Sequence, residues 1–195
     1  MGGNEGNARL TAAVAAVLLV LLAGEGATIP FVRQLMTWHV FLGLLLVPPV
    51  AVKMLSVGWR FMHYYRGHAD YVAQGPPHPL LRFLVGPVTV VTTVVLFGTG
   101  LVIAFEHPHE GLIIGLHKVS FIIWFGAMSL HVIAHARTVW RYARRGMEKA
   151  LPGRALRQVV LLASIVAGVA FAVAALPQAH AWTHWASSHH HHEDH

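Results

Sequence analysis

His117 and His131 stand fourteen residues apart in an apolar stretch of the chain, 111–145. In a helix that turns by about 100° per residue, this spacing falls about 40° short of four full turns, so both imidazoles share one face. At about 1.5 Å per residue they are about 21 Å apart along the axis, which fits within a bilayer core about 30 Å thick. Histidine inside a lipid-embedded helix is costly and usually functional. Two histidines at this spacing suggest two cofactor levels, one towards each leaflet.

A second apolar segment, 31–65, repeats the fourteen-residue spacing with His39 and Lys53. One further apolar segment lies between 31–65 and 111–145, so these two segments cross a membrane in the same direction. His39 and His117 then lie at similar depth, and we expect them to pair near the outer leaflet (the outer pair). The same register pairs Lys53 with His131 near the inner leaflet (the inner pair).

The segment between them, 80–105, carries the same spacing a third time, in Gly86 and Gly100. A flat macrocycle held between helices needs small residues where its edge meets a neighbouring backbone, and glycine permits that approach. We expect Gly86 and Gly100 to line such a site, with Gly98 adding space.

The composition places these residues in a membrane protein. The 195-residue chain is 55% hydrophobic and only 11% charged, whereas soluble domains are about 25% charged. It contains no cysteine, which excludes disulfides, iron–sulfur clusters and the C-x-x-C-H motif of covalently attached haem. The net charge of +6 does not indicate nucleic-acid binding, because the basic residues cluster beside apolar segments, where they set membrane topology.

Five apolar segments divide the chain, and we expect one all-α transmembrane domain, 1–176, followed by a polar tail, 177–195. The helices are expected at about 10–27, 31–65, 80–105, 112–145 and 156–176. The first run, 10–24, also fits a secretory signal peptide, and we favour a retained helix. The tail holds seven histidines, a composition that suits weak binding of divalent metals, and we expect it to be disordered.

Lysine and arginine are distributed unequally between the two ends of these helices. One side receives only Arg33 and Lys118, and the other receives Arg9, Arg60, Arg66, Arg82, Arg137, Arg141, Arg144, Arg145, Lys149, Arg154 and Arg157. By the positive-inside rule, the richer side is cytoplasmic. We therefore expect a plasma (inner) membrane protein with its N-terminus inside and its His-rich tail outside.

The ligands fourteen apart on the second and fourth segments, with glycines fourteen apart on the third, resemble the four-helix haem bundle of the membrane cytochromes b. That superfamily includes the cytochrome b of quinol-oxidising complexes and subunits that serve hydrogenases and formate dehydrogenases. The resemblance covers about 10–145. It implies an up-and-down transmembrane bundle with one additional helix, haem b held by two imidazoles, transmembrane electron transfer and often a quinone site. His39, His117 and His131 match ligand positions of the family.

Lys53 departs from the family pattern, which has a histidine at this position. It can extend its amine to the headgroups, ligate iron as a neutral amine, or pair with a haem propionate, and Met54 beside it is another candidate ligand. His135 lies one turn beyond His131 on the same face and is the alternative ligand, and we prefer His131. Charges at helix ends set topology and can also pair with propionates; we include Arg82 among the cofactor-binding residues.

The leading hypothesis is a b-type cytochrome that carries electrons within the membrane, with haem b at one or two levels. Membrane quinone or quinol is its expected redox partner in the bilayer. A separate redox protein completes the net reaction, so the chain is an electron-transfer subunit rather than a complete enzyme. Two other classes stay open: a proton or metal-ion transporter that uses buried histidine and lysine, and a structural membrane subunit.

Overall fold

The computed structural model describes residues 3–67, 81–106, 111–145 and 154–189, with side chains at 14–67, 83–106, 111–136 and most of 155–177. This part of the chain is almost entirely helical and contains no strand. Its helices are α1 (Gly3–Thr28), α2 (Met36–Tyr65), α4 (Gly86–Glu106), α5 (Leu112–Arg145) and α6 (Arg154–His189). A 3₁₀ turn, Ile29–Phe31, follows α1, and a π-helical turn, Leu81–Val85, precedes α4.

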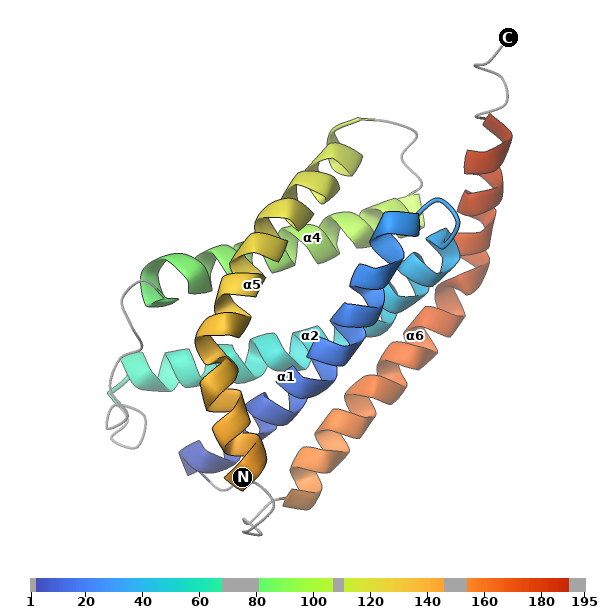
Figure 1. Ribbon diagram of the computed structural model, residues 1–195. Helices are drawn as coiled ribbons and strands as arrows, with labels where there is room; N and C mark the ends of the chain where they lie inside the picture. Colours follow the sequence, from blue (N-terminus) through green and yellow to red (C-terminus); the bar gives the residue numbers. More distant parts are fainter. Residues whose placement is uncertain (1–2, 68–80, 107–110, 146–153, 190–195) are drawn as a thin grey trace.

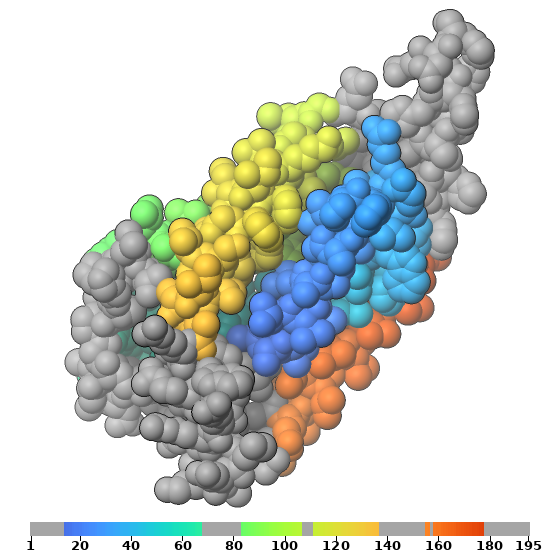
Figure 2. Space-filling view, in the orientation of Figure 1, coloured from blue at the N-terminus to red at the C-terminus, as the bar shows by residue number. Residues whose placement is uncertain are grey.

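Within the described residues, five helices are long and apolar enough to cross a membrane. Large apolar side chains cover their outer surfaces; Val20, Leu55, Ile122 and Val166 are between 67% and 74% exposed. Surfaces of this kind contact lipid chains in a bilayer. Figure 2 shows one face of the molecule, on which α1, α5 and α6 present their sides. The chain is therefore an all-α, multi-pass membrane protein, and the fold class predicted from composition is confirmed at this level.

The helices run alternately up and down, so that α2 and α5 run in the same direction (Figure 1). α1 and α6 pack against α2, and α4 packs against α5, whereas the two groups make fewer contacts with each other. α6 lies at the edge of the bundle (Figure 1). α2 and α5 cross obliquely in this view (Figure 1), and the predicted pairing of their polar residues requires their common direction.

α2 is continuous through Pro48 and Pro49, although proline has no N–H to donate to the carbonyl four residues earlier. Pro49 thus leaves the carbonyl of Leu45 without its usual helical donor. Gly168 of α6 packs against this Leu45 carbonyl, and a Cβ added there would overlap it. Glycine allows the two backbones to approach, and the core around this contact contains Leu44, Leu45, Ala172 and Ala175.

The helix ends differ from the predicted ones at three places. α1 begins at Gly3 rather than near residue 10, and α2 begins at Met36 rather than 31. The later start of α2 has a local cause, because Pro30 lies in the 3₁₀ turn before it. α6 continues through Pro177 to His189, where a disordered tail was expected. A proline removes only one helical hydrogen bond, and the alanines and glutamine that follow favour helix; residues 190–195 of the predicted tail lie outside the described part.

Candidate functional site

His39 lies near the start of α2 and is held by the end of α1. Its Nδ1 lies 2.9 Å from Oε1 of Glu25 and 3.0 Å from Oγ1 of Thr28. The Thr28 hydroxyl donates its own hydrogen to the carbonyl oxygen of Glu25, at 2.6 Å, so its oxygen acts as an acceptor towards His39. Both neighbours accept from Nδ1–H, and this network assigns a hydrogen of the His39 imidazole to Nδ1.

His117 lies on the second turn of α5 and is held by α4. Its Nδ1 lies 3.0 Å from Oγ1 of Thr99 and 3.2 Å from the carbonyl oxygen of Leu96. A carbonyl can only accept a hydrogen bond, and the Thr99 hydroxyl donates its hydrogen to the carbonyl of Val95 at 2.7 Å. The hydrogen of a neutral His117 imidazole is therefore on Nδ1 as well.

These two networks leave the same ring nitrogen available on both histidines. Among the described residues, no hydrogen bond involves Nε2 of His39 or of His117. Histidines that ligate metals typically donate their other N–H to a carboxylate or carbonyl, which fixes the ring and raises its basicity. The outer pair thus has matching tautomers on two helices that run in the same direction.

Gly100 of α4 packs against the ring of His117. A Cβ added at Gly100 would lie 3.2 Å from Cε1 and 3.7 Å from Nδ1 of His117, so any side chain there would displace the imidazole. The expected neighbour was the edge of a macrocycle, and the neighbour observed is the imidazole itself. Gly98 has open space around it, and Gly86 is the partly buried first residue of α4.

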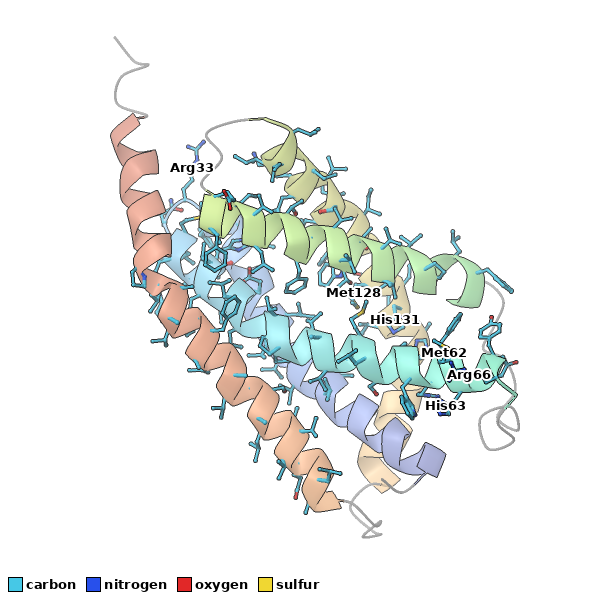
Figure 3. All side chains as sticks on the ribbon, turned by 180° about the vertical axis from the view of Figure 1, so that it is seen from behind. Arg33, Met62, His63, Arg66, Met128 and His131 are labelled. Atoms are coloured by element: carbon cyan, nitrogen blue, oxygen red, sulfur yellow. The ribbon has the colours of Figure 1, made fainter. Side chains whose placement is uncertain are left out.

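The second level is predicted at Lys53 of α2 and His131 of α5, and this pairing stays a prediction from the fourteen-residue register. The His131 ring stacks on that of His135, with centroids 4.4 Å apart and planes 24° apart. His135 donates from Nδ1 to the carbonyl of His131 at 2.9 Å. In Figure 3, the labelled side chains of Met128 and His131 lie between the ribbons of α4 and α2.

Two kinds of observation bear on which inner histidine is the ligand. Depth and spacing favour His131. His135, however, uses Nδ1 in a hydrogen bond, as His39 and His117 do, and this leaves its Nε2 for a metal.

Trp124 occupies the space between the two levels on α5. It stands seven residues from His117 and seven from His131, which is about two helical turns in each direction. The side chain is 7% exposed, and its Nε1 donates to Oγ1 of Thr93 at 3.0 Å. The indole is therefore a fixed part of the interior between α4 and α5.

An apolar cavity of about 230 Å³ opens between α2 and α4. It is lined by Val47, Val50, Ala51, Met54, Thr93, Val94 and Phe97. Its α2 residues Val47, Val50 and Ala51 fall between the outer and inner levels, and Met54 directly follows Lys53. The weakly packed junction between the two groups of helices thus lies beside the polar residues that the sequence singled out.

Three residues that hold the outer histidines, Glu25, Thr28 and Thr99, were missed in the sequence. Of these, Glu25 alone gave a signal, as an acid at the end of an apolar run. Trp124 could have been found from its position midway between two histidines on one face. The side chain of Arg82 lies outside the described ones.

No family model, curated protein or solved structure matches this chain.

Proposed function

We propose that this protein is a b-type cytochrome, which binds haem b between α2 and α5 and carries electrons within the membrane. The observation that carries the proposal is the pair of imidazoles at the outer level. His39 and His117 come from helices that run in the same direction, have their Nδ1 hydrogens engaged by acceptors, and keep Nε2 for a metal.

The residues present fit haem b at this level. Two neutral imidazoles are a common axial ligand set for haem iron, and the remaining requirements are apolar surroundings and space. Gly100 provides room for the His117 ring at the outer level, and the apolar cavity between α2 and α4 lies farther along α2, towards Lys53. When bound, haem b supplies reversible one-electron chemistry.

The protein's own part is to hold and orient the ligands and to exclude water. Glu25 and Thr28 fix the ring of His39, while Thr99 and the Leu96 carbonyl fix the ring of His117. Because the acceptors come from α1 and α4, all four bundle helices contribute to one site. The five apolar helices provide a sheath from which water is largely excluded.

The inner pair is proposed as a second haem site, with His131 as one ligand and Lys53 as the other ligand or a propionate partner. Membrane quinone or quinol and a separate redox protein are the proposed electron partners, and Arg82 is a proposed propionate partner. We also propose a plasma-membrane location with the N-terminus inside, because basic residues gather on that side.

A pyridine haemochrome assay on the purified protein tests the proposal. The wild type should be red, with a Soret band that shifts on reduction by dithionite, and His39→Ala and His117→Ala should each lower its haem content. His63→Ala is the matched control. His63 also donates from Nδ1, to the carbonyl of Trp59 at 2.9 Å, but it lies near the end of α2, away from the proposed ligands. The His63→Ala protein should keep its haem. A colourless wild type would contradict the proposal, and proton flux by such a protein in vesicles would favour a transporter.

A further inference from the structure

Glu25 places a carboxylate inside an apolar segment, Val14–Phe31, that is suited to cross the membrane. Its side chain is only 14% exposed. Oε1 accepts from His39, whereas Oε2 is buried and has no hydrogen-bond partner among the described residues. Acidic side chains at such places are rare and usually functional, because a buried charge needs compensation.

The immediate surroundings of this carboxylate offer little compensation. α2 presents Gly43 to it, and a Cβ there would lie 3.7 Å from Oε1. The Thr28 hydroxyl donates its hydrogen bond to the main-chain carbonyl of Glu25 and not to the carboxylate. The ion pair that the structure gives Glu25 is with His39, and a histidine that ligates iron through Nε2 is neutral. A positive centre beyond His39 would supply the missing compensation.

The two outer histidines differ in this respect. His117 donates to neutral acceptors, the Thr99 hydroxyl and the Leu96 carbonyl, whereas His39 donates to a carboxylate. A carboxylate partner makes an imidazole a stronger electron donor, and hydrogen bonding around the ligands is one of the ways a protein sets a haem potential. The site is therefore electrically asymmetric.

We infer that Glu25 is a positioning residue that acts through His39 and lowers the reduction potential of the outer haem. The inference rests on the proposed function. Reduced haem iron becomes oxidised by losing one electron, so the oxidised form carries one more positive charge. The buried negative charge of Glu25 stabilises that extra positive charge, so it favours the oxidised state.

A redox titration of the purified full-length protein with its haem tests this inference. Glu25→Gln keeps the size of the side chain and an oxygen that can accept from His39, but removes the charge. Glu25→Asp keeps the charge and moves it away from the ring. The midpoint potential should be lowest in the wild type, intermediate in Glu25→Asp and highest in Glu25→Gln, with the haem content of Glu25→Gln close to that of the wild type.

Thr99→Val is the control for losing an acceptor without losing a charge. It removes one neutral acceptor of His117 and leaves the Leu96 carbonyl in place, so its shift should be smaller than that of Glu25→Gln. A potential in Glu25→Gln equal to or below that of the wild type overturns the inference.

If Glu25→Gln loses its haem, the comparison of the wild type with Glu25→Asp decides, and equal potentials overturn the inference. A wild type without haem is a different result, because it rejects the proposed function itself.

Discussion

An imidazole inside a membrane must place its N–H against an acceptor, since lipid offers none. His39 and His117 meet this requirement with side-chain and main-chain oxygens of neighbouring helices. The same hydrogen bonds that make burial tolerable also select the tautomer that can ligate a metal. At the residue scale, stability and proposed function therefore depend on the same few contacts.

Gly100 gives the sharpest prediction at this scale. Gly100→Leu should displace the His117 ring, because even a Cβ would lie 3.2 Å from Cε1. Overpacking typically costs about 1–3 kcal/mol, which corresponds to a roughly 5- to 150-fold loss of haem affinity. The haem-to-protein ratio after purification measures this loss.

Gly98→Leu is the matched control, because Gly98 lies on the same helix with no atom within 4 Å of an added Cβ. Membrane insertion should be unaffected in both variants, since each segment stays apolar. Equal haem content in the two variants would show that Gly100 does not limit the position of His117.

At the scale of the elements, the site depends on how helices of opposite direction are brought together. α2 and α5 carry the proposed ligands, while α1 and α4 carry the groups that orient them. α6 contributes packing, through small residues set against the proline-containing part of α2. Loss of α6 packing should therefore affect stability first and the ligands only indirectly.

Gly168→Leu tests the role of α6. The new side chain would overlap the Leu45 carbonyl, so we expect a loss of about 1–3 kcal/mol of stability. A lower midpoint of thermal unfolding in detergent measures it. Gly126 on α5 has no atom within 4 Å of an added Cβ, so Gly126→Leu should unfold close to the wild type. An equal effect of both changes would contradict the packing account.

The sequence predicted these elements unevenly. Long apolar runs located the helices, because this feature belongs to one segment at a time. The fourteen-residue spacings predict that His39 pairs with His117 and Lys53 with His131, and these pairings stay predictions. The end of α6 at His189 was missed, because the polar, His-rich composition of the tail was taken to indicate disorder. Thr28 and Thr99 were missed because their role depends on how α1 and α4 pack, which spacing along one helix does not contain.

At the scale of the whole molecule, five helices enclose polar residues at two depths, about 21 Å apart along α5 by helical rise. At the outer level, hydrogen bonds orient both histidines, whereas at the inner level the rings of His131 and His135 stack on each other. Trp124 lies between the levels and is hydrogen-bonded to α4. The arrangement suits an electron path directed across the bilayer.

The number of haems is the prediction that belongs to this scale. With both sites filled, about two haems are expected per chain, and His131→Ala should leave about one. Lys53→Met should change the spectrum of the inner haem if Lys53 ligates it, and Lys53→His should give it two imidazole ligands. A wild-type ratio of about one that His131→Ala does not change would leave a single-haem cytochrome.

The central claim is that His39 and His117 together hold one haem, and the spin state of the oxidised protein tests it most directly. Electron paramagnetic resonance of the wild type should show low-spin, six-coordinate iron, because two imidazoles complete the coordination. His39→Ala and His117→Ala should each remove the outer-site component of that signal, by loss of haem or by conversion to high-spin iron. A full low-spin signal retained in both variants would contradict the pairing.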